Sequence, residues 1–157
     1  MRKIQNPYAK AGRLDYQCFG CSPDNPIGLH LEFWEEGEEV IAKWMPRKSL
    51  QGFRDVLHGG IQATLLDEIA NWVVQTRCKT VGVTSSMDIT YRRPVLVSDG
   101  EITLRARVKE AGTRMAIIET ELLGNDGKLC ASAVVKCFLF NAEKASEEYF
   151  YPGADAF

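Results

Sequence analysis

The segment Val56-Leu57-His58-Gly59-Gly60 precedes a long apolar stretch, Ile61 to Gln75, and has the composition of a helix start that binds an anion. Two adjacent glycines leave no side chain over the first backbone N–H groups, which have no partners inside the helix. The positive end of the helix dipole adds to the attraction for a negatively charged oxygen. The segment therefore predicts a site for the oxyanion that develops on a carbonyl oxygen during acyl transfer.

The helix predicted over Ile61 to Gln75 also carries carboxylates. Nine of its residues are apolar and surround nearly the whole circumference, which predicts a helix buried in a core. The polar residues follow spacings of three and four and form one narrow stripe: Thr64, Asp67, Glu68, Asn71 and Gln75. A carboxylate that faces a protein interior is costly unless it is paired or used in chemistry.

The spacing between the glycines and the acid limits how they can cooperate. Gly59 and Asp67 are eight residues apart, which is about 12 Å along a helix axis. One thioester or ester carbonyl cannot touch both. If both act on one substrate, the second group must come from an antiparallel copy of the helix across a dyad. We therefore expect a homodimer with composite sites.

Composition excludes several classes of protein. The chain has 157 residues, a single-domain length, and a net charge of −2 with scattered lysines and arginines, so we expect no nucleic-acid partner. Residues 1–14 lack the apolar core of a signal peptide, and no run is long enough to cross a membrane. We expect a cytoplasmic protein that does not bind membranes.

The cysteines, five in number, are predicted to be reduced thiols, because the number is odd and nothing indicates secretion. Cys18-Phe19-Gly20-Cys21 could be half of a zinc site, but the other soft ligands are distant cysteines and the two histidines. A redox motif is disfavoured because no β-α-β pattern surrounds it. We interpret the motif as a turn before Asn25-Pro26-Ile27-Gly28, and we expect no metal and no cofactor.

The rest of the chain predicts an α+β fold. Alternating apolar residues over 29–34 and 40–44 flank a charged turn, Glu35 to Glu39, which indicates a hairpin. After the helix, four alternating runs follow at about 83–91, 102–109, 115–123 and 129–139, joined by short turns. We expect one domain over residues 1–157, with a central helix against an antiparallel sheet of about six strands. Residues 1–25 would be an extension and residues 143–157 a peripheral tail.

Several motifs together resemble a known family. They are the HGG-x6-D spacing from His58 to Asp67, Cys-Phe-Gly-Cys followed by Asn25-Pro26-x-Gly28-Leu29, the Ala63 to Glu68 run, and Gly82-Val83-Thr84 leading to Asp88-Ile89-Thr90-Tyr91-x-x-Pro94. They resemble the hotdog fold and, within it, the acyl-coenzyme A thioesterases of the phenylacetic-acid-degradation type. The resemblance extends from about Cys18 to Phe140.

The resemblance implies roles for particular residues. The Gly59 N–H would polarise the thioester carbonyl, and Asp67 from the partner subunit would act as nucleophile or general base. Thr84 would hold water or the carboxylate. The family commonly has an Asn or Gln seven residues before the glycine as a second carbonyl donor, but here that position is Gly52, with Gln51 beside it. Many relatives pair their dimers into tetramers.

Other candidates keep two interpretations. The substrate-binding candidates are His58, Gly60, Gln51, Asn71, Arg92 and Arg93. His58 either shapes the turn or binds substrate, Asn71 either orients water or ends the polar stripe, and the arginines either contact coenzyme A phosphates or are solvated. Asp67 and Thr84 could also be an interface carboxylate and an ordinary strand residue. Glu68, turned about 100° from Asp67, is expected to be solvated or ion-paired, with the role of base as the alternative.

Three functions fit these residues to different degrees. Hydrolysis of acyl- or aryl-coenzyme A comes first, because a thiolate leaves readily and one carboxylate can suffice. The alternative is a non-catalytic acyl-coenzyme A sensor with the same pocket. A hydratase comes last, because it would need a histidine beside the acid, and only His30 and His58 are available.

Overall fold

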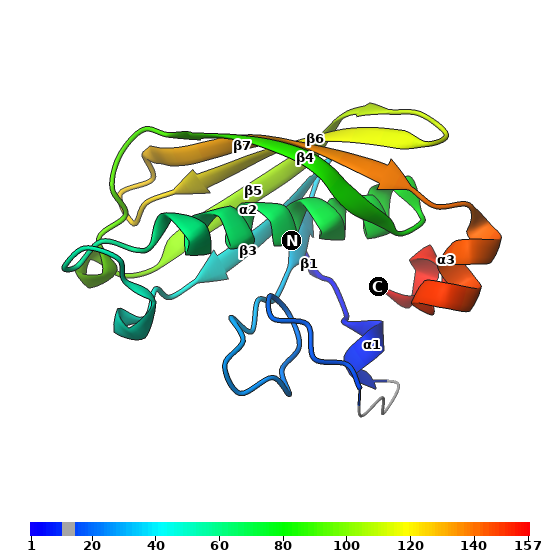
Figure 1. Cartoon of the computed structure of the whole chain (residues 1–157), viewed down its shortest axis with the longest axis horizontal. Coiled ribbons are helices and arrows are strands. Elements are labelled where there is room, and N and C mark those ends of the chain that lie inside the picture. The colour runs from blue at the N-terminus through cyan, green and yellow to red at the C-terminus, as the bar shows by residue number, and fades with distance from the viewer. Residues whose placement is uncertain (11–14) are drawn as a thin grey trace.

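The computed structural model describes residues 1–10 and 15–157. The elements in chain order are β1 (Arg2–Lys3), α1 (Pro7–Lys10), β2 (Trp34–Glu36), β3 (Glu39–Trp44), α2 (Gly59–Val73), β4 (Gly82–Tyr91), β5 (Ile102–Ala111), β6 (Met115–Leu123), β7 (Leu129–Leu139) and α3 (Ala142–Tyr149). Figure 1 shows α2 lying along one face of the sheet, with α1 and the N-terminal loop on the side of α2 away from it.

The sheet has seven antiparallel strands in the order β1-β2-β3-β5-β6-β7-β4. The four strands after α2 confirm the predicted runs, and the one strand beyond the expected six is β1. Arg2 pairs with Glu35, so part of the predicted N-terminal extension belongs to the sheet.

The predicted first strand over residues 29–34 is wrong in its extent. The β2–β3 hairpin begins only at Trp34 and turns after Glu36. Leu29 and Leu31 instead donate their N–H groups to the carbonyl oxygens of Phe19 and Gly20, at 2.7 and 2.9 Å. The N-terminal loop thus takes the backbone bonds that a longer hairpin would have used, and the alternating apolar residues are buried beneath that loop.

Helix α2 forms the centre of the core. It begins at Gly59, two residues before the predicted start, and a wider π-helical turn from Val74 to Cys78 follows its last residue. Leu65, Leu66, Ile69 and Ala70 are fully buried, which confirms the prediction of a buried helix. Because these buried side chains hold α2 rigidly against the sheet, the backbone positions of the polar stripe are fixed relative to the sheet.

Strand β4 lies at an edge of the sheet, and within the described chain its one partner strand is β7. It is ten residues long and mostly accessible, with Val83 and Tyr91 about half exposed. A bulge between Thr84 and Ser86 shifts the register with β7. A long edge strand presents unpaired N–H and C=O groups, and these can pair with another chain.

Candidate active site

The N-terminus of α2 keeps one backbone donor available. His58 is the N-cap, and its Nδ1 accepts the Gly60 N–H at 2.9 Å. The N–H groups of Ile61 and Gln62 both donate to the His58 carbonyl at 3.0 Å. Of the first helical N–H groups, only that of Gly59 has no partner among the described residues. The donor available to an incoming oxygen is therefore Gly59, and the Gly60 N–H is occupied by the cap.

The surrounding loop fixes this helix start. The His58 N–H donates to the Leu50 carbonyl at 3.0 Å, and the buried Gln62 amide donates to the Leu57 carbonyl at the same distance. The Tyr91 hydroxyl donates to the Gly59 carbonyl at 2.7 Å and joins the end of β4 to the helix start. Sequence reasoning missed Tyr91, because only the fold brings it to Gly59.

Gln51 lies in the same loop. Its side-chain oxygen accepts the Asp55 N–H at 3.1 Å, and this bond stabilises the turn from Gln51 to Asp55. Any contact with a substrate carbonyl would therefore use the remaining amide nitrogen.

Asp67, Asn71 and Thr84 meet where α2 faces β4. The Thr84 hydroxyl donates to Asp67 Oδ1 at 2.5 Å. The Asn71 side-chain nitrogen donates to the Asp67 carbonyl oxygen at 3.0 Å and lies 3.4 Å from the Thr84 oxygen. Among the described residues none donates to Asp67 Oδ2. One carboxylate oxygen is thus fixed and the other can accept a proton or attack a carbonyl carbon.

The residue of β7 next to Asp67 and Thr84 is a cysteine. Cys137 pairs with Thr84 across the β4–β7 ladder. Burial, with a smaller contribution from the Asp67 charge, raises the pKa of Cys137 to about 11. Cys137 therefore remains a neutral thiol at neutral pH, which makes it a packing residue beneath the carboxylate.

The two candidate groups of one chain do not meet. Helix α2 runs without interruption from Gly59 through Asp67. Eight residues of helix separate them by about 12 Å along the axis. Within one chain, therefore, the free N–H and the free carboxylate oxygen cannot act on the same carbonyl carbon.

The remaining candidates lie elsewhere. Arg92 and Arg93 follow β4 beside Tyr91, are exposed, and both donate their backbone N–H to the Cys130 carbonyl. The Arg93 guanidinium also lies 3.6 Å from the Asp126 carboxylate. Both arginines follow Tyr91 in the chain, and the Tyr91 hydroxyl donates to the Gly59 carbonyl, so the arginines lie near the Gly59 end of α2. His30 contacts the Asn25 carbonyl in the N-terminal loop, so neither histidine hydrogen-bonds to Asp67.

Glu68 was expected to be solvated or ion-paired, and the structure places it differently. Its Oε1 accepts the Trp72 indole N–H at 3.2 Å and a contact from the Cys18 thiol at 3.4 Å. Cys18 and Cys21 lie with their sulfurs 3.2 Å apart. In the described part of the chain, these two thiols and this carboxylate are the group that could hold a metal ion. Sequence reasoning missed it, because Cys18 and Glu68 are 50 residues apart.

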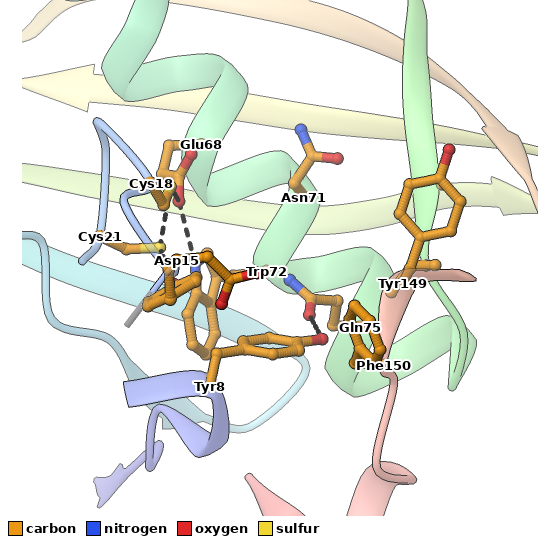
Figure 2. A pocket seen from close by; sticks show the side chains of 13 residues that line it. Tyr8, Asp15, Cys18, Cys21, Glu68, Asn71, Trp72, Gln75, Tyr149 and Phe150 are labelled. Carbon is orange, nitrogen blue, oxygen red and sulfur yellow. Dashed lines mark hydrogen bonds between the residues drawn. The ribbon is translucent and has the colours of Figure 1, made fainter. Parts of the chain in front are cut away.

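A cavity of about 320 Å³ extends from this cluster past Asn71. Figure 2 shows Cys18, Cys21 and Glu68 at one end, Tyr149 and Phe150 at the other, and Asn71 between them. Tyr8 contributes to the wall and hydrogen-bonds Gln75 at 2.5 Å. Asn71, which lines the cavity, lies one helical turn after Asp67 and donates to the Asp67 backbone carbonyl oxygen.

Comparison with known proteins is consistent with this geometry. The model of the thioesterase superfamily matches residues 55–131, the segment that holds Gly59, Asp67 and Thr84. The mouse protein acyl-coenzyme A thioesterase 13 is 35% identical over 96 residues, which are 60% of this chain and 68% of the mouse protein. The chain belongs to the thioesterase superfamily.

Solved structures of this superfamily share the fold. Zebra fish thioesterase superfamily member 2 is 25% identical, with a TM-score of 0.63 over 70% of this chain and 81% of that one. A hypothetical thioesterase protein from Streptococcus pneumoniae TIGR4, solved with coenzyme A, is 20% identical, with a TM-score of 0.65 over 71% and 86% of the two chains. The expected hotdog fold is confirmed. In the described residues, every helix is too short or too polar to span a bilayer.

The cap geometry predicts how substitutions of His58 affect folding. His58→Ala removes the acceptor of the Gly60 N–H and should lower the free energy of unfolding by about 0.5–2 kcal/mol. His58→Asn supplies a capping oxygen in place of the imidazole nitrogen and should recover most of that loss. Urea denaturation of the three proteins measures both effects. If both variants lost the same free energy of unfolding, restoring a capping acceptor would have no effect, and the cap would not account for the stability that His58 provides.

Proposed function

We propose that this protein hydrolyses acyl-coenzyme A thioesters to the free acid and coenzyme A. The observation that carries the proposal is that two groups suited to thioester hydrolysis have no partner among the described residues: the Gly59 N–H at the start of α2 and Oδ2 of Asp67. Two relatives support it: the mouse protein is named an acyl-coenzyme A thioesterase, and the Streptococcus pneumoniae structure contains coenzyme A.

The proposed active site is shared between two copies of the chain. Because α2 separates Gly59 from Asp67, each site takes its oxyanion donor from one subunit and its acid from the other. The open edge of β4 supports such a dimer, because two copies can pair there antiparallel and bring their α2 helices together across the dyad. Pairs of such dimers would give the tetramer.

The chemistry needs only these groups, the thioester and water. Asp67 Oδ2 takes a proton from water as the water oxygen attacks the carbonyl carbon, and the Gly59 N–H stabilises the charge on the carbonyl oxygen. The C–S bond then breaks, and the coenzyme A sulfur recovers the proton. Alternatively, Oδ2 itself attacks the carbonyl carbon, the C–S bond breaks to release the coenzyme A thiolate, and water hydrolyses the resulting mixed anhydride to the free acid and Asp67. Thr84 orients the carboxylate for either route by holding Oδ1.

The substrate would lie along the surface between these groups. The acyl or aryl group would enter the cavity beside Asn71, whose walls include Tyr8, Trp72 and Tyr149. Arg92 and Arg93 are exposed beyond Tyr91 at the Gly59 end, where they would contact coenzyme A phosphates. Coenzyme A is part of the substrate, and we propose no further cofactor for the reaction. We also propose that the protein works in the cytoplasm, without nucleic-acid or membrane partners.

Replacement of Asp67 tests the proposed acid. Asp67→Asn keeps the Oδ1 that accepts the Thr84 hydroxyl and removes the basic Oδ2, so turnover should fall about 10²–10⁴-fold with the fold intact. A thiol-reactive chromogenic disulfide follows coenzyme A release from a panel of acyl- and aryl-coenzyme A thioesters. Glu101→Gln, an exposed acid elsewhere, is the control and should keep full turnover. Near-normal turnover of Asp67→Asn would refute the assignment. If the wild-type protein bound acyl-coenzyme A saturably without releasing thiol, the result would favour a non-catalytic acyl-coenzyme A sensor.

Replacement of Gly59 tests the proposed oxyanion donor. Proline has no N–H and is well tolerated at the first helical position, and His58, with ψ of 134°, already has the conformation that a following proline requires. Gly59→Pro should therefore lower turnover about 10²–10³-fold with α2 preserved. Gly59→Ala keeps the N–H, and its Cβ would meet the Tyr91 oxygen only at an ordinary 3.6 Å. Equal activity of the proline and alanine variants would contradict the role of this donor.

A further inference from the structure

The N-terminal loop brings two thiols against a carboxylate of α2, away from the groups proposed to act on the thioester. Cys21 is buried and Cys18 half-buried, and their sulfurs are 3.2 Å apart. Glu68 Oε1 lies 3.4 Å from the Cys18 sulfur, and the ligand atoms of all three residues lie within 4.8 Å of one another. Figure 2 shows the three side chains converging at one end of the cavity.

The approach of the loop to the helix is close. A Cβ on Gly20, between the two cysteines, would lie 2.4 Å from the Glu68 carboxyl carbon. Only glycine therefore fits there while the carboxylate keeps its position. The Tyr16 hydroxyl lies 2.9 Å from the Cys21 sulfur, and the Asn6 amide donates to the Cys21 carbonyl at 3.3 Å. Tyr16 and Asn6 thus help to fix the position of Cys21.

The Cys18–Glu68 and Cys18–Cys21 distances are close to those of a tetrahedral zinc site. With Zn–S of about 2.3 Å and Zn–O of about 2.1 Å, a tetrahedron places its two sulfurs about 3.8 Å apart and each sulfur about 3.6 Å from the oxygen. The Cys18–Glu68 distance of 3.4 Å needs almost no change, and the sulfurs, at 3.2 Å, must separate by about 0.6 Å. A disulfide would require the sulfurs to approach by about 1.1 Å.

The charge of the carboxylate also favours a cation. The described donors to Glu68, the Trp72 indole and the Cys18 thiol, are neutral. A half-buried carboxylate gains more from a cation than from neutral donors, because burial weakens solvent screening. Two thiolates and one carboxylate form a donor set that suits zinc, whereas magnesium and calcium prefer oxygen ligands alone.

We propose that Cys18, Cys21 and Glu68 bind one zinc ion, with the fourth position open to water from the cavity. The ion joins the N-terminal loop to α2 at Glu68. The proposal does not depend on thioester hydrolysis.

Metal binding to the whole protein tests the proposal directly. Protein purified without chelators should contain one zinc per chain by elemental analysis. After the zinc is removed under reducing conditions, cobalt should bind in the same ratio, with the thiolate charge-transfer band and the visible bands of tetrahedral cobalt, and zinc should displace it. A chain that binds no cobalt through thiolate would overturn the proposal. So would the loss of two titratable thiols in the absence of reductant, which would identify a disulfide pair instead.

Variants locate the ion. Cys18→Ser, Cys21→Ser and Glu68→Gln should each weaken cobalt binding more than about 10-fold. Gly20→Ala removes no ligand but displaces the Glu68 carboxylate, so it should weaken binding as well. Cys78→Ser, a half-buried cysteine outside the cluster, is the matched control and should bind as the wild type does. Unchanged binding by Glu68→Gln would exclude the carboxylate ligand and refute the site as proposed.

Discussion

The burial of α2 against the sheet is the constraint on which the rest of the structure depends. Apolar side chains around most of its surface hold the helix rigid and continuous from Gly59 to Val73. A rigid helix keeps the donor at its N-terminus and the acid at its middle about 12 Å apart. Packing that stabilises one chain therefore prevents that chain from completing the proposed active site alone, and the proposal requires a second copy.

The polar stripe of the same helix divides into two faces with different partners. Asp67 faces β4, where Thr84 fixes one carboxylate oxygen and leaves the other accessible. Glu68, the next residue, is turned toward the N-terminal loop and meets Cys18 there. Neighbouring acids on one helix thus acquire separate environments, because one residue of helix rotates the side chain by about 100°. Glu68 and Asn71 both line the cavity.

The sequence predicted what depends on local pattern. The glycine pair marked the start of α2, apolar periodicity marked its burial, and alternation marked the strands that follow. It did not predict β1 or the shortened hairpin, because the N-terminal loop competes for the backbone of Leu29 and Leu31. It also missed the contact of Cys18 with Glu68. Such contacts join segments distant in the chain, and no local spacing encodes them.

The central claim is that each active site combines Gly59 of one subunit with Asp67 of the other. The most direct measurement mixes equal amounts of Gly59→Pro and Asp67→Asn protein, exchanges their subunits by mild denaturation and refolding, and follows thiol release. Neither parent has an intact site, but each mixed dimer has one. Random exchange should therefore restore about a quarter of the wild-type turnover. Turnover that stays at the average of the two inactive parents, with mixed dimers shown to form, would contradict the shared site.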